Sequence, residues 1–118
     1  MLCWVLKDGI NKMRQKIWLS YDLGIRGDYE AFYTWLDQLK AKECGNNLAV
    51  FDYEWNGSLK EALEAEIGAA IQITRNTRIY AIYRREDGIT GSFIIGRRKA
   101  PPWSGYAPQT EPADVDVS

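Results

Sequence analysis

Hydrophobic and polar side chains alternate along residues 16–23, and this period of two predicts a β-strand. One face of the strand carries Ile17, Leu19, Tyr21 and Leu23, and the other carries Trp18, Ser20 and Asp22. Residues 48–55, with the sequence LAVFDYEW, alternate in the same way. They predict a second strand, with Asp52 and Glu54 on its less apolar face.

A period of 3.6 residues predicts two helices. The first follows Asp28, which occupies an N-cap position, and its apolar stripe continues to about residue 42. Gly45 suits the left-handed conformation beyond the end of that helix. The second helix follows Ser58-Leu59-Lys60-Glu61, a capping box, and its inner face extends to Ile71.

The last third of the chain predicts a hairpin. Residues 77–85 and 89–98 form two strand-like segments joined by Glu86-Asp87-Gly88, and Pro101-Pro102 ends the sheet. The order β-α-β-α-β-β predicts an α+β sandwich, with two helices on one face of a mostly antiparallel sheet of four to five strands. If the segment from residue 48 instead breaks into two strands, the order becomes β-α-β-β-α-β with one further strand.

The pattern divides the chain into one domain and two terminal segments. The domain covers residues 16–107, and residues 1–15 form an N-terminal extension in which Met13 is an alternative start. Residues 108–118 are acidic and without periodicity, which predicts a disordered tail.

The amino-acid composition limits which catalytic and metal-binding sites the chain can form. Histidine is absent, which removes the commonest general base and His-based zinc sites. The 15 basic residues face 16 acidic ones, of which Glu111, Asp114 and Asp116 lie in the tail, so the domain itself is weakly positive. Two cysteines without metal-type spacing indicate reduced thiols in a cytoplasmic protein, and no apolar run is long enough to predict a membrane span.

Three short motifs occur in a characteristic order: Ser20-Tyr21-Asp22, Ala49-Val50-Phe51-Asp52 and Arg78-Ile79-Tyr80. In this order, over residues 16–85, the chain resembles the small CRISPR-associated adaptation proteins, the virulence-associated protein D family and SinR-like proteins. The resemblance implies a ferredoxin-like fold and a homodimer, formed through sheet faces and the C-terminal segment. In active members the strand-end aspartate binds metal together with its copy across the dimer axis. That role carries over only to Asp22, and residues 24–28 lack the basic cluster often found there.

Two interpretations of Asp22 follow. In the first, Asp22 is a catalytic and metal-binding residue: its carboxylate and that of a second subunit hold one Mg²⁺ beside a phosphodiester. Alternatively, it is a turn residue whose side chain accepts hydrogen bonds from nearby amides. Asp52 and Glu54 either supplement a metal site or are solvent-facing residues of a half-exposed strand.

Five basic residues form a candidate nucleic-acid-binding site, and the pairing of the last two strands predicts that they lie at one end of the hairpin and its continuation. They are Arg84, Arg85, Arg97, Arg98 and Lys99. The alternative is a solvated sheet edge that charge protects against aggregation. Trp103 and Tyr106 are large aromatic residues outside regular structure, and they predict an interface, either with the protein's own core or with a partner subunit.

Together these features predict a non-catalytic, dimeric binding module of bacterial or phage origin, with nucleic acid or protein as its partner. Defence, counter-defence and mobile elements are the settings that the resemblance implies. The alternative is a Mg²⁺-dependent endonuclease acting on RNA or DNA, with the Asp22 pair as its metal site.

Overall fold

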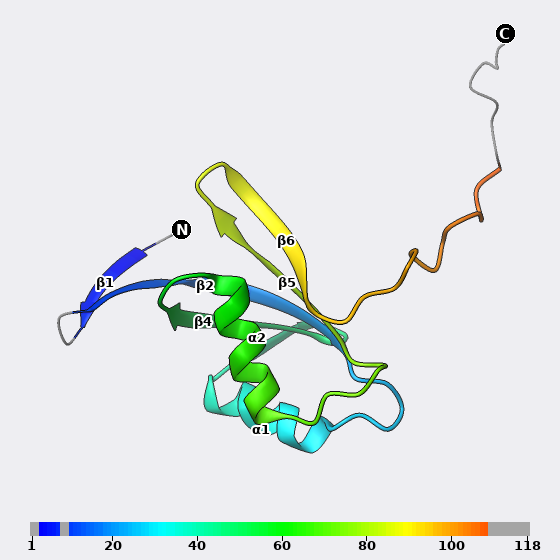
Figure 1. Ribbon diagram of the computed structural model, residues 1–118, viewed down its shortest axis with the longest axis horizontal. Helices are drawn as coiled ribbons and strands as arrows, with labels where there is room; N and C mark the ends of the chain where they lie inside the picture. The colour runs from blue at the N-terminus through cyan, green and yellow to red at the C-terminus, as the bar shows by residue number, and fades with distance from the viewer. Residues whose placement is uncertain (1–2, 8–9, 109–118) are drawn as a thin grey trace, which may run out of the picture.

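The computed structural model describes residues 3–7 and 10–108, which form two helices and six strands (Figure 1). In chain order the elements are β1 (Cys3–Lys7), β2 (Ile10–Asp22), α1 (Tyr29–Gln38), β3 (Lys42–Gly45), β4 (Leu48–Trp55), α2 (Leu59–Ala70), β5 (Arg78–Arg85) and β6 (Gly88–Ile95). No helix within these ranges has the length and apolarity that crossing a membrane requires.

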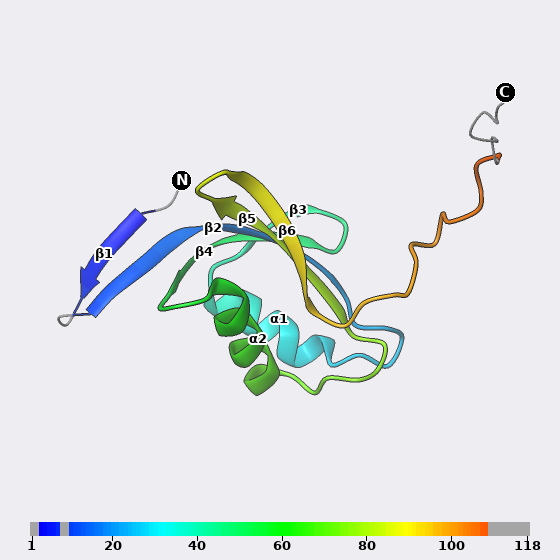
Figure 2. The same cartoon turned by 45° about the horizontal axis from the view of Figure 1, so that its top comes forward.

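The strands form one open sheet in the order β3-β4-β2-β5-β6, and every neighbouring pair is antiparallel. Strand β1 lies off this path and pairs with the first residues of β2. Both helices cover the same face of the sheet, and the other face is open (Figures 1 and 2). The predicted α+β sandwich and its final hairpin are therefore confirmed.

The alternating residues of the central strands build the core. Residues 15–21 of β2, residues 49–55 of β4 and residues 79–83 of β5 alternate: their odd-numbered side chains are buried against the helices, and the even-numbered ones lie on the open face. The helices contribute Phe32, Trp35 and Leu36 from α1 and Leu59, Leu63 and Ile67 from α2. Ser58 caps α2 as predicted, because its Oγ accepts a hydrogen bond from the Glu61 amide at 3.3 Å.

The start of the regular structure was predicted wrongly. Strand β2 begins at Ile10 rather than residue 16, and its first five residues pair with β1, so the N-terminal extension contains a β-hairpin. Asp28 precedes α1, but its side chain makes no cap bond and instead accepts the Gln72 amide at 2.9 Å.

Helix α1 is also shorter than predicted. It ends at Gln38 because Lys40 adopts the left-handed conformation, with φ 57°. The residues that follow form β3, so from β2 onward the order is β-α-β-β-α-β with a further strand, as in the alternative prediction. Its extra strand nevertheless lies before residue 48 and does not arise by breaking β4.

The C-terminal segment leaves the sheet after β6 and runs away from the body (Figure 1). Trp103 and Tyr106 are 73% and 85% exposed, so the alternative in which they dock on the protein's own core is wrong, and an interface with a partner subunit stays a prediction. The predicted tail lies outside the described residues, except for Pro108.

Candidate functional site

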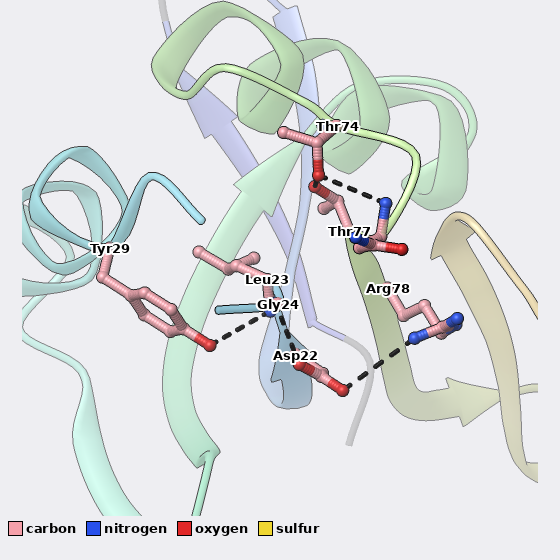
Figure 3. Close-up of polar contacts among 8 residues, drawn as sticks. Asp22, Leu23, Gly24, Tyr29, Thr74, Thr77 and Arg78 are labelled. Carbon is pink, nitrogen blue, oxygen red and sulfur yellow. Dashed lines mark hydrogen bonds and ion pairs between the residues drawn. The ribbon is translucent and has the colours of Figure 1, made fainter. Parts of the chain in front are cut away.

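Asp22 is the last residue of β2 and faces Arg78, the first residue of β5 (Figure 3). Its Oδ1 accepts a hydrogen bond from the Gly24 amide at 3.0 Å, and its Oδ2 lies 3.9 Å from Nη1 of Arg78. Gly24 has φ +80°, which favours glycine, so the aspartate and the glycine together form the turn that leaves the strand. The side chain of Asp22 is 53% exposed and could still be reached by a ligand.

Two loops are joined beside Asp22. The amide of Leu23 donates to the Tyr29 hydroxyl at 3.3 Å, and the buried Thr77 accepts the Thr74 amide through Oγ1 at 2.9 Å (Figure 3). A Cβ on Gly24 would lie 3.0 Å from the Cβ of Asn76, so loop 23–28 and loop 71–77 are in close contact. The two hydrogen bonds each lie within one loop, and the loops are joined by the close approach of Gly24 to Asn76 and by the bond from the Gln72 amide to Asp28.

A metal site needs more ligands than one copy provides at this position. Within the described residues, no group of three or more Cys, Asp or Glu side chains could hold an ion. Asp52 shares the open face with Asp22, but it pairs with Lys16, six residues along β2 or about 20 Å away. Asp52 and Asp22 therefore do not act on one ion, and the guanidinium of Arg78 beside Asp22 opposes a cation there.

The five predicted nucleic-acid-binding residues form two groups, so the prediction that they share one end of the hairpin is wrong. Arg85 pairs with Gly88 and Ile79 pairs with Ile95, which puts Arg84 and Arg85 at the turn end of the hairpin. Residues 97–99 follow the opposite end, about 24 Å along the strands.

At that opposite end, residues 97–99 join three arginines that were not predicted as part of a site. A Cβ on Gly96 would collide with the carbonyl oxygen of Thr77, so the segment after β6 lies against the start of β5. Loops 23–28 and 71–77 approach the same place (Figures 1 and 2). We call this surface the basic end; its residues are Arg26, Arg75, Arg78, Arg97, Arg98 and Lys99.

Most cationic side chains of the basic end make no ion pair with a described residue. Among the described residues, only Arg78 of the six makes an ion pair, with Asp22. The carboxylate of Asp28, on the same loop as Arg26, accepts a main-chain amide. The other five cationic side chains are exposed and available to an anionic ligand.

The open face of the sheet has an apolar centre. Trp18, in the middle of β2, is 37% exposed and pairs in register with Val50 and Ile82. Farther along the face the Tyr80 and Phe93 rings meet edge to face, with centroids 4.9 Å apart. Asp52 bridges Lys16 and Arg14 at 3.3 and 3.7 Å, so the charges beside the centre largely neutralise one another.

A groove of about 510 Å³ lies far from Asp22, between the start of α2 and the turn end of the hairpin. It is lined by Met13, Gln15, Trp55, residues 57–60 and residues 83–86. Sequence reasoning missed this groove because its lining comes from four separate elements.

Two tyrosines have perturbed acidity, and neither lies in a cluster of catalytic groups. Burial, followed by the neighbouring Glu66 carboxylate that accepts its hydroxyl at 3.0 Å, raises the pKa of Tyr53. Glu66 also accepts the indole N–H of Trp35 at 2.9 Å, so this group ties α2 to the core. Burial, and next the adjacent Tyr33, raises the pKa of Tyr21.

In comparisons with known proteins, no family model, no curated protein and no solved structure matches this chain. The candidate sites consequently rest on the geometry described above.

Proposed function

We propose that this protein is a non-catalytic, homodimeric module that binds nucleic acid through the basic end. The core is proposed to be ferredoxin-like, because β2, α1, β3, β4, α2 and β5 follow one another in that order and their strands lie in the order β3-β4-β2-β5. Strand β6 then extends this unit at one edge.

The observation that carries the proposal is the convergence of six basic residues from three separate segments at one end of the sheet. Two of these segments contact each other through Gly24 and Asn76, and the segment after β6 packs against Thr77. The cations are therefore presented on a connected set of loops. Phosphate groups of a nucleic-acid backbone are the ligands that several exposed Arg and Lys side chains favour.

The rest of the molecule indicates what kind of binding to expect. The chain has a formal net charge of −1, so no long-range positive field surrounds it and attraction is confined to the basic end. Binding is proposed to be independent of base sequence and strongly weakened by salt, because it depends on phosphate contacts.

The test is fluorescence anisotropy with labelled single-stranded and duplex oligonucleotides at several salt concentrations. Arg97→Gln combined with Arg98→Gln is expected to weaken binding about tenfold and to reduce the slope of log K against log salt by about 1.4 to 1.8. The matched control is Lys42→Gln combined with Lys60→Gln, which removes two exposed charges from β3 and the start of α2. Equal losses in both double variants, or no binding by the wild type, would refute the proposal.

The endonuclease remains the second candidate function, because Asp22 is half exposed at a strand end. It requires Asp22 of a second copy to complete the metal site. The contacts of Asp22 with Gly24 and Arg78 support the binding module instead. Incubation of RNA and DNA with Mg²⁺ separates the two functions: cleavage by the wild type that Asp22→Asn abolishes would favour the nuclease.

A further inference from the structure

The two edges of the strand path β3-β4-β2-β5-β6 differ in how well they are protected. The outer edge strand β3 has only four residues, two of them Lys42 and Glu43, and a register shift follows Glu43. Short length, charge and irregularity are the features by which natural sheets prevent further strand pairing. The other edge strand, β6, has eight residues with the sequence GITGSFII and contains no charged residue and no proline.

Within the described residues, nothing pairs with the outer side of β6. The strand also keeps that side accessible, because Gly88, Thr90, Gly91 and Ser92 are small. Its largest exposed side chain, Ile89, is 68% exposed. An unprotected, uncharged strand of this length is a template for pairing with another β-strand.

We propose that β6 pairs antiparallel with β6 of a second copy, so that two sheets become one continuous sheet. This inference rests on the proposed function for the homodimer and identifies the surface that forms it. An antiparallel strand can pair with its own copy about a two-fold axis, so one surface serves both subunits. The segment after β6 is a poorer occupant, because it contains Pro101, Pro102 and Pro108 and leads away from the sheet (Figure 2).

The open face is the competing dimer surface. Two of its aromatic residues already contact each other: the Tyr80 ring meets Phe93 and lies so close to Gly91 that a Cβ there would be 2.6 Å from it. The charged residues beside Trp18 are likewise paired within the chain. The outer main chain of β6 has no such internal partner among the described residues, which favours the edge.

Pairing of this kind also places the basic residues at the turn end of one hairpin near those that follow β6 in the other copy. Antiparallel pairing brings the Ile95 end of β6 next to the Gly88 end of the second copy. Residues 97–99 of one copy then lie near Arg84 and Arg85 of the other, and their mutual repulsion keeps the free dimer weak. Because a bound polyanion neutralises this repulsion, an oligonucleotide strengthens the dimer.

The first experiment is light scattering of the full chain over about 1 to 100 µM protein, since dimer formation depends on concentration. A particle of twice the 13.5 kDa chain mass is expected at the upper end, and at lower concentration when an oligonucleotide is present. Thr90→Lys places a charge on β6 on the face opposite Trp18, and it is expected to raise the dimer dissociation constant at least about tenfold. Cys44→Lys on β3 is the matched edge control, and Trp18→Lys tests the open face.

Hydrogen exchange supplies a second measurement that needs no substitution. Amides of residues 88–95 are expected to gain protection as protein concentration rises, whereas those of residues 42–45 are not. A wild type that stays monomeric with and without oligonucleotide, or a dimer lost in Trp18→Lys but kept in Thr90→Lys, would overturn the inference. Oligonucleotide binding by a monomer would remove the homodimer but leave the proposed binding of nucleic acid at the basic end intact, so the two failures are distinguishable.

Discussion

The side-chain amide of Gln15 makes two hydrogen bonds with the main chain of Arg84. Its Nε2 donates to the Arg84 carbonyl at 3.0 Å, and its Oε1 accepts the Arg84 amide at 2.8 Å. The register between β2 and β5 runs only from Trp18 to Asp22, so Gln15 lies where the two strands have separated. The glutamine thus replaces the main-chain bonds of a strand partner and extends the contact between β2 and β5.

Replacing Gln15 with leucine is expected to lower the free energy of unfolding by about 2 to 3 kcal/mol, because both main-chain groups of Arg84 lose their partners. Gln15 is only 4% exposed, so water does not readily substitute for it. Urea denaturation measures the loss. Gln38→Leu at the exposed end of α1 is the control, with an expected change within about 0.5 kcal/mol. Equal stability of Gln15→Leu and the wild type would show that these bonds contribute nothing.

Gln15 also explains why the start of β2 could not be predicted. In the alternating pattern it occupies a buried position, where residues 17, 19 and 21 are apolar. A polar residue at a position where the alternation requires an apolar one makes the strand pattern end there in the sequence. Its partner lies 69 residues away on β5, and only the folded structure brings the two together.

The central strands and α2 could be predicted because each contains its own complete pattern of buried residues. Strand β3 could not, since its four residues alternate too briefly and its stability comes from pairing with β4. The basic end was missed for a related reason. Arg26 is far along the chain from Arg75 and Arg78, and the strand order brings all three near residues 97–99.

Asp22→Ala is expected to lower the free energy of unfolding by about 1 kcal/mol, and Asp22→Asn by less than about 0.5 kcal/mol. Asparagine keeps an oxygen that can accept the Gly24 amide, and the half-exposed ion pair with Arg78 contributes little. Thermal or urea unfolding of both variants in the absence of Mg²⁺ measures the difference. If asparagine is as destabilising as alanine, the charge of Asp22 matters more than its role in the turn.

Above pH 10, stability is expected to fall with a contribution from Tyr53. Its pKa in the folded state lies above the ordinary value of 10.0, so the unfolded chain loses this proton first. The stabilisation is complete below pH 10 and is lost as pH rises toward the higher folded-state pKa, at up to about 1.4 kcal/mol per pH unit. Urea unfolding at several pH values between about 9 and 11, on either side of the ordinary tyrosine pKa, measures this loss. The free energy of unfolding of Tyr53→Phe is expected to fall less steeply with pH than that of the wild type. Parallel curves would contradict this assignment.

Substitution of both Trp103 and Tyr106 by alanine is expected to leave the unfolding free energy of the monomer unchanged within about 0.5 kcal/mol. Both side chains are exposed, and the local turns that hold this segment use main-chain bonds from Ser104 to Pro101 and from Tyr106 to Trp103. Urea unfolding at low protein concentration tests this, with Phe32→Ala as a buried aromatic that should cost about 3 to 5 kcal/mol. Loss of stability in the double variant would mean that the segment docks on its own domain. Loss of dimerisation alone would place it in the contact between two copies, as the sequence also predicts.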